Sequence, residues 1–184
     1  MGTDRQPLLP LRRPWWVLVI GAMLVFGFYQ ELAKLHLNDY LSTLADHPKL
    51  ADASPAERAA FWAQSVPPRI VNYYEITEPW PVFHHMSFTT LRLLKWLLGA
   101  GILALFFTLD ALFLRVTGNG DLRTALLGVY AFVGTLMLVI AALAPGSAGY
   151  DVARELLGFL QSPLPSFMLV FVRWMLTRMQ QPRT

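Results

Sequence analysis

Cysteine is absent from this sequence of 184 residues. That absence excludes disulfide bonds, thiolate metal sites and a cysteine nucleophile, and it leaves the redox compartment open. Charged residues are also scarce: they make up 15% of the chain, whereas soluble domains carry about 25%. Much of the folded surface is therefore expected to face something other than water.

The basic residues of the chain do not form the pattern of a nucleic-acid-binding surface. Its formal net charge is +3, and no basic stripe with interleaved aromatic residues occurs, so no nucleic acid partner is expected. Lysine and arginine stand mainly beside apolar runs, where they set the orientation of membrane helices. The sequence also contains no internal repeat and no low-complexity tract.

Apolar residues make up 55% of the chain, and they gather in four stretches long enough to consider as membrane helices. The predicted spans are 15–29, 88–115, 125–144 and 162–179. Arg12, Arg13 and Pro14 introduce the first span, and no A-x-A-like cleavage site follows it, so we interpret it as an uncleaved signal anchor. Its helix is expected to continue to about residue 45.

Basic residues near the ends of the spans predict the topology. With four spans, the arginines before the first span, between the second and third, and after the fourth all fall on one side, which should be the cytoplasm. The cytoplasmic parts are then 1–14, 116–124 and 180–184, and the outer parts are 30–87 and 145–161. The predicted fold class is all-α: an integral membrane four-helix bundle, N-in/C-in, with a largely helical extracytoplasmic segment between the first two spans.

The outer segment 30–87 has the pattern of an ordered structure. An apolar stripe at i, i+3, i+4, i+7 spacing continues the first helix; its members are Leu37, Tyr40, Leu41 and Leu44. Ser54 and Glu57 then form the S-x-x-E pattern of a capping box, with Pro55 at the first helical position. A second, short helix is therefore predicted to begin there.

Two adjacent histidines, His84 and His85, stand just before the second span. Adjacent histidines can ligate a metal or shuttle protons, so these two are the candidate metal residues. No recognised metal spacing joins them to other ligands, and the alternative is interfacial packing and hydrogen bonding. We expect no metal, no other cofactor and no catalytic residues, because no nucleophile and base stand in a recognised pattern.

One acid and one base interrupt apolar runs: Asp110 in the second span and Arg173 in the fourth. Charges at membrane depth are costly and usually pair or line a cavity. Each stands five residues before a flanking arginine, which places both about 7.5 Å inside the cytoplasmic ends of their helices. The matched depths predict an intramembrane Asp110–Arg173 ion pair. The alternative is that each side chain snorkels separately to the headgroups.

Arg92 and Lys95 lie at the outer end of the second span, on neighbouring positions of one helix. The ordinary role of such residues is to anchor the helix at the level of the lipid headgroups. A more specific alternative is that they bind an anionic lipid headgroup. The sequence leaves both interpretations open.

The stretch QSPLPSF, residues 161–167, places two prolines inside an apolar segment. A proline in a helix interior removes a hydrogen bond and clashes with the preceding turn, whereas in the first turn it does neither. We therefore predict a helix elbow, with Ser162 as N-cap, Pro163 as the first helical residue and Pro165 in the first turn. A short amphipathic helix at the outer interface should precede it, and the elbow should pack against other helices.

Several of these stretches resemble small membrane proteins associated with exosortases of the F and X types. Those proteins share a signal-anchor span followed by a segment like FGFYQELAKLHLNDYL, three further spans, and a final helix introduced by a Q-x-P-L-like motif, here QSPL. The start of the second span resembles their R-x-x-x-N-x-x-x-S region: Arg92 matches, while Lys95 and Trp96 stand where the family tends to have Asn. The long segment between Leu44 and Phe83 is closer to the X type.

The resemblance implies an accessory function. Exosortases are membrane transpeptidase-like enzymes that process C-terminal sorting signals with a Cys, an Arg and a His, so this chain is not the enzyme itself. The resemblance implies a non-catalytic, multi-pass protein of the bacterial cytoplasmic (inner) membrane that assists protein sorting. Its partners would be the lipid bilayer and an exosortase or its substrates. The alternative is a small oligomeric transporter or a lipid-handling membrane protein, because intramembrane charge and a broken helix are typical of transporter sites.

Overall fold

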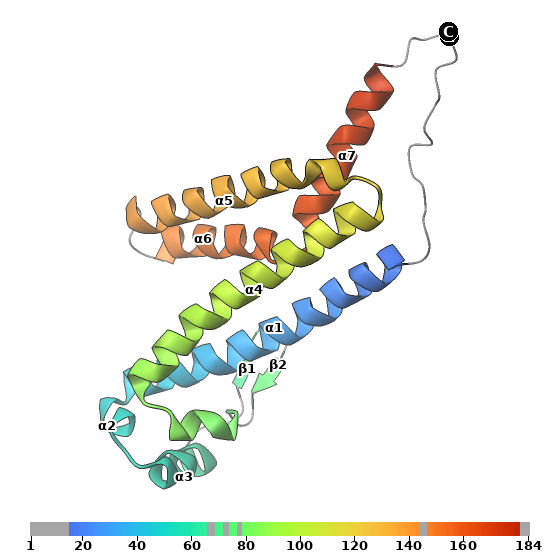
Figure 1. Cartoon of the computed structure of the whole chain (residues 1–184). Coiled ribbons are helices and arrows are strands. Elements are labelled where there is room, and N and C mark those ends of the chain that lie inside the picture. Colours follow the sequence, from blue (N-terminus) through green and yellow to red (C-terminus); the bar gives the residue numbers. More distant parts are fainter. Residues whose placement is uncertain (1–14, 66–68, 72–73, 77–78, 144–146, 181–184) are drawn as a thin grey trace, which may run out of the picture. The chain divides into compact units, whose positions relative to one another are not determined.

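The computed structural model describes residues 15–65, 69–71, 74–76, 79–143 and 147–180. This part of the chain is built from seven α-helices, two short 3-10 helices and one two-stranded hairpin (Figure 1). In order, the elements are α1 (Trp15–Asp46), α2 (Pro48–Ala51), α3 (Pro55–Ser65), β1 (Arg69–Val71), β2 (Tyr74–Ile76), η1 (Pro81–His85), α4 (Phe88–Val116), η2 (Gly120–Leu122), α5 (Arg123–Leu143), α6 (Ser147–Leu160) and α7 (Leu164–Met179). The all-α prediction is confirmed except for the hairpin, which pairs its strands antiparallel with Ile70 opposite Glu75.

Three helical segments are long and apolar enough to cross a membrane: Trp15–Asp46, Phe88–Val116 and Gly120–Ile140. The helices α6 and α7 qualify as a fourth if they are counted together, and they are bent by 67° at their break. The first helix continues past Tyr29 without interruption, as predicted from its apolar stripe. The described chain therefore holds three or four candidate membrane spans.

The chain folds as two compact units. One unit is Phe28–Ile102, and the other consists of the described parts of Met1–Gly27 and Leu103–Thr184. Because α1 and α4 are long, each of them contributes residues to both units.

The core of the unit Phe28–Ile102 is built on the predicted stripe of α1. All four stripe residues are buried, together with Leu50, Trp62, Phe83 and Leu91. The ring of Tyr40 stacks on Trp62 with centroids 5.5 Å apart, and Phe83 of η1 lies against the same tyrosine at 5.7 Å. The stripe therefore serves to pack α3 and η1 against α1.

The helix α3 begins with the predicted capping box. The Ser54 N–H donates to Glu57 Oε2 at 2.8 Å, and the Glu57 N–H donates to Ser54 Oγ at 3.3 Å. These two bonds satisfy backbone donors that have no partner inside the helix. The hydrogen bonds from Ser54 also hold the pKa of the Glu57 carboxyl below its ordinary value.

A buried arginine on α3 ties the same unit together. Arg58 is only 5% exposed, and its guanidinium donates to four backbone carbonyls. Two of them, Leu50 and Ala51, stand at the end of α2, and the other two, His84 and Met86, stand at the end of η1. Carbonyls at helix ends carry partial negative charge, so these four stabilise the buried cation.

In the second unit, α5 and α6 lie side by side and run antiparallel, and α7 turns away after the elbow (Figure 1). Leu114, Leu126, Tyr130 and Leu160 form the buried centre of this packing. Lipid tails are as apolar as leucine, so burying such side chains inside a bilayer brings little hydrophobic gain. Close packing and interhelical hydrogen bonds are therefore expected to hold these helices together.

Candidate functional site

The predicted elbow is present between α6 and α7. α6 ends at Leu160 and α7 begins at Leu164, one residue later than predicted, with Pro163 rather than Ser162 in the N-cap position. The reason is the backbone of Pro163: its ψ of 0° departs from the value of about −42° in a regular α-helix, so Pro163 flanks α7 while its carbonyl accepts from the Phe167 N–H at 3.1 Å. Ser162 nevertheless contacts the helix start, because its Oγ accepts from the Leu164 N–H at 3.3 Å.

The first proline leaves a carbonyl of α6 without its usual donor. In a continuous helix, the Phe159 carbonyl would accept from the N–H of residue 163, but proline has no N–H. The hydroxyl of Ser162 replaces that donor and bonds the Phe159 carbonyl at 2.7 Å. Ser162 therefore closes the end of α6 as well as touching the start of α7.

The next carbonyl of α6 is satisfied from another helix. The Leu164 N–H, which would bond the Leu160 carbonyl in a continuous helix, is directed to Ser162 instead. The hydroxyl of Tyr130, on α5, lies 2.8 Å from the Leu160 oxygen and supplies the missing donor. A side chain of α5 thus substitutes for the backbone bond that the elbow breaks.

Asp110 of α4 joins the same arrangement. Its side chain is fully buried, at 0% exposure. Its Oδ2 lies 2.8 Å from Tyr130 Oη, and its Oδ1 accepts from the hydroxyl of Ser166 in the first turn of α7. We call this group the elbow cluster: the side chains of Asp110, Tyr130 and Ser166 with the carbonyl of Leu160. It links α4, α5, α6 and α7 through polar contacts in an apolar surrounding, where hydrogen bonds are strong and unpaired polar groups are costly.

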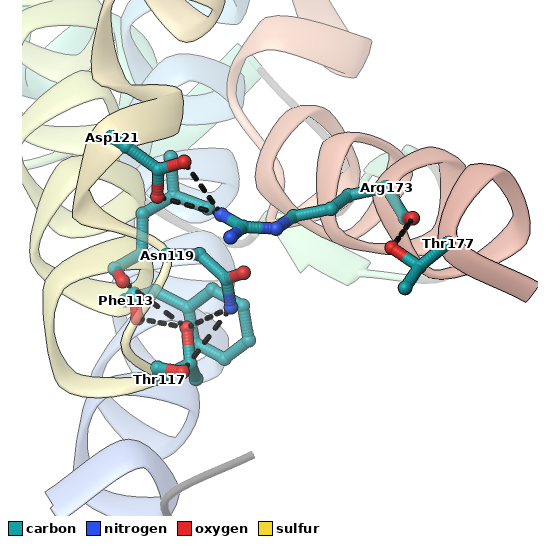
Figure 2. Close-up of polar contacts among 7 residues, drawn as sticks. Phe113, Thr117, Asn119, Asp121, Arg173 and Thr177 are labelled. Carbon is teal, nitrogen blue, oxygen red and sulfur yellow. Dashed lines mark hydrogen bonds and ion pairs between the residues drawn. The ribbon is translucent and has the colours of Figure 1, made fainter. Parts of the chain in front are cut away.

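The predicted Asp110–Arg173 ion pair is wrong. Arg173 pairs with Asp121 of η2, its Nη1 lying 2.6 and 2.7 Å from the two carboxylate oxygens (Figure 2). Ser166 and Arg173 are seven residues apart and so share one face of α7, but Arg173 lies about 10.5 Å further along the helix. Ser166 is therefore the residue of α7 that meets Asp110. The prediction from matched depths failed because it assumed that α7 runs straight across the membrane.

The Arg173–Asp121 pair lies at the surface of its unit. The two side chains are 42% and 65% exposed, so the pair is screened by solvent and fixes geometry more than it adds stability. The hydrogen bonds from Arg173 hold the pKa of the Asp121 carboxyl below its ordinary value. The pair joins α7 to the turn between α4 and α5.

That turn is shaped by a glycine and by the side chains of Thr117 and Asn119, which Figure 2 shows. Gly118 has φ 77°, a left-handed conformation that strongly favours glycine. Thr117 Oγ1 donates to the Phe113 carbonyl at 2.8 Å, and Asn119 Nδ2 donates to the Thr117 carbonyl at 3.2 Å. These bonds close the end of α4 and hold Asp121 where Arg173 reaches it.

The histidine candidates belong to the other unit. His84 Nδ1 lies 3.0 Å from Tyr40 Oη, and His85 is exposed. His36 stacks on Trp80 at 5.5 Å between centroids. Across the described part of the chain, no three His, Cys, Asp or Glu residues gather as a metal would need. The contact of His84 favours the packing interpretation over a metal site.

Arg92 and Lys95 are exposed on the first turns of α4. The guanidinium of Arg92 lies over the ring of Phe88 at 5.9 Å, and Trp96, one turn further, is 76% exposed. Exposed tryptophan beside basic residues is typical of the membrane–water interface. The arrangement favours anchoring at the headgroup level.

Three polar residues that matter for the packing were not predicted: Tyr130, Ser166 and Arg58. Tyr130 is the one tyrosine in the third predicted span, and a hydroxyl inside an apolar run was an available signal. Ser166 follows the second proline, and a serine in the first turn of a helix is too ordinary to indicate a buried contact. Arg58 bonds backbone carbonyls, and such partners leave no pattern in a sequence.

Comparison of the chain with models of protein families, with curated proteins and with solved structures finds no match. The supported description is a small helical protein with three or four candidate membrane spans.

Proposed function

We propose that the protein is a non-catalytic integral membrane accessory protein that assists an exosortase-type protein sorting system. The observation that carries the proposal is the role of the QSPL stretch, which resembles the family's motif. Its residues form the bend between α6 and α7, and the elbow cluster forms around them. The motif residues thus set the geometry of the last helix, as expected of a protein that positions a partner.

We further propose that α6 and α7 together make the fourth crossing, in place of α7 alone. α6 has 14 residues and runs along α5, so it covers about 21 Å of depth. α7 has 16 residues, about 24 Å, but at 67° to α6 it advances only about 9 Å in that direction. The two depths together are close to the thickness of the hydrocarbon core of a bilayer, about 30 Å. Both termini then lie on the cytoplasmic side of a bacterial inner membrane.

The side chains of α7 are of the kinds expected for a helix that lies at a small angle to the membrane plane. Arg178 lies over the ring of Trp174 at 5.1 Å, and tryptophan with arginine is typical of the membrane interface. Beyond the elbow, large apolar side chains of α7 are exposed within the chain: Phe171, Trp174, Leu176 and Met179. Lipid or a partner helix must cover them, and the proposed partner is the exosortase.

Co-purification from native membranes in mild detergent tests the proposal. We expect a stoichiometric exosortase with the wild-type protein and a large loss of it in the double variant Phe171→Ala, Trp174→Ala. Phe132→Ala is the control, because Phe132 is also an exposed aromatic residue but lies on α5. Wild-type protein that retains no exosortase, or equal loss in the control, contradicts the proposal.

The second candidate function is a small oligomeric transporter or lipid-handling protein. The observation in its favour is a buried carboxyl group at a broken helix, a combination found at transporter sites. Solute flux in proteoliposomes, or tightly retained lipid in a preparation without an exosortase, supports this candidate against the first.

A further inference from the structure

The elbow cluster has more close oxygen contacts than hydroxyl hydrogens. Tyr130 Oη lies 2.8 Å from both Asp110 Oδ2 and the Leu160 carbonyl. A tyrosine hydroxyl has one hydrogen, while an ionised carboxylate and a carbonyl both only accept. If Asp110 were ionised, one of these two short contacts would join two oxygens with no hydrogen between them.

One additional hydrogen, on Asp110 Oδ2, resolves the arrangement. The Asp110 hydroxyl then donates to Tyr130 Oη, and Tyr130 donates to the Leu160 carbonyl. Ser166 Oγ donates to Asp110 Oδ1. Ser166 also lies 3.1 Å from the Pro163 carbonyl, but that carbonyl already accepts from the Phe167 N–H and needs no further donor. Every contact of Asp110 and Tyr130 then has its hydrogen.

The charges around Asp110 do not compensate an ionised form. Its hydrogen-bond partners are two neutral hydroxyls. Arg173 of α7 is engaged by Asp121, and Arg123 at the start of α5 is exposed. On α6, the charged residues Asp151, Arg154 and Glu155 are all exposed, and the described α1 residues of this unit, 15–27, carry no titratable group. A buried, unpaired charge at this position would be costly.

We propose that the elbow cluster is a proton-binding site: Asp110 holds one proton at neutral pH, and that proton keeps the α6–α7 elbow closed. When the proton leaves, the carboxylate draws the Tyr130 hydrogen to itself, because hydrogen bonds to charged acceptors are stronger. The Leu160 carbonyl then loses its donor in a dry surrounding, which favours opening of the bend. This inference rests on the hydrogen bonds of the cluster and not on the accessory role proposed above.

Infrared absorption of the full-length protein in lipid nanodiscs tests the proton directly. A protonated carboxylic acid gives a carbonyl-stretching band that shifts on hydrogen–deuterium exchange. We expect this band in the wild-type protein at neutral pH, its loss in Asp110→Asn, and its retention in the control Asp151→Asn, which removes an exposed carboxyl. A wild-type protein without the band, or a band that survives Asp110→Asn, overturns the proposal.

The link to the elbow needs a second measurement. Asn can donate from its amide as the protonated acid does, so we expect Asp110→Asn to keep a thermal midpoint near that of the wild type at neutral pH. From the ordinary carboxyl value of 3.8 up to the pH at which the folded protein also releases this proton, unfolding sets one proton free, so the wild-type thermal midpoint should fall with rising pH relative to that of Asp110→Asn. Parallel profiles of the two proteins overturn the link.

A third variant covers the case in which Asp110→Asn does not fold. Tyr130→Phe keeps the acid and removes the oxygen that accepts its proton. The acid band should then move to the frequency of a more weakly hydrogen-bonded acid, relative to the control Tyr29→Phe. A band that does not move shows that the acid observed is not Asp110, and the assignment fails.

Discussion

Removing one hydroxyl group should loosen the contact between α5 and the elbow. In Tyr130→Phe, the ring keeps its place, where it packs edge-on against Phe107 with centroids 5.1 Å apart. Only the Oη atom is lost, and with it the contacts at 2.8 Å to Asp110 and to the Leu160 carbonyl. The substitution therefore changes hydrogen bonding with little change in packing.

The size of the effect follows from those two contacts. Interhelical hydrogen bonds in membrane proteins contribute on average about 0.6 kcal/mol and at most about 1.7 kcal/mol each. A buried carbonyl left without a donor adds a penalty of about 1–3 kcal/mol when no other group or water reaches it. We therefore expect Tyr130→Phe to lower the free energy of unfolding by about 2 kcal/mol. A change of this size alters the ratio of folded to unfolded protein by about 30-fold.

Equilibrium unfolding in mixed detergent micelles, followed by circular dichroism, measures this loss. Tyr29→Phe is the matched control, because the Tyr29 side chain is 63% exposed and its hydroxyl has no role in the cluster. The control should change stability by less than about 0.5 kcal/mol. If Tyr130→Phe were as stable as the control, the Tyr130 hydroxyl would not be replacing the backbone bond at Leu160, and the reasoning about the elbow would be refuted.

Three further predictions address other parts of the molecule. Arg58→Met should destabilise the unit Phe28–Ile102 by about 2–4 kcal/mol, because it removes the buried guanidinium that bonds backbone carbonyls of both α2 and the end of η1. Hydrogen exchange over 48–51 and 81–86 should accelerate in this variant, and not in the exposed control Arg92→Met. Because the pKa of Asp121 is lowered in the folded protein, its pair with Arg173 stabilises the protein at pH values above the ordinary carboxyl value of 3.8 and loses that effect as the pH falls through the lower folded value. This acid dependence of the thermal midpoint should disappear in Asp121→Asn. If it persists, another group causes it. Because the chain has no cysteine, single substitutions report topology cleanly: a membrane-impermeant maleimide should label Ala63→Cys in intact cells and Thr124→Cys only after permeabilisation, and the reverse pattern would invert the proposed orientation.

Local patterns in the sequence were sufficient for the long helices, but not for α2 or for the β1–β2 hairpin. The predicted second span, 88–115, corresponds to α4 at Phe88–Val116, because an uninterrupted apolar run has well-defined ends. The capping box at Ser54 was predicted from four residues, since its hydrogen bonds run between near neighbours. The bend at Pro163 was likewise predicted, because the chemistry of proline requires no distant partner.

Contacts between elements could not be predicted in the same way. The depths of Asp110 and Arg173 along their helices were estimated from helical rise, but rise alone says nothing of how a helix is rotated or tilted. The 67° bend and the seven-residue spacing bring Ser166 to Asp110 and send Arg173 to Asp121. A single polar residue in an apolar run has several potential partners, and packing selects among them.

The sequence by itself determined the long helices and their approximate limits, that the chain suits a membrane, and that it must bend at QSPLP. The tertiary structure alone decided which groups meet at that bend: Tyr130 at the Leu160 carbonyl, and Asp110 between Tyr130 and Ser166. The physical reason is the range of the interactions. Hydrophobic periodicity, capping and proline act within a few residues, whereas the pairing of buried polar groups depends on crossing angles and helix rotation, which the packing of the whole unit sets.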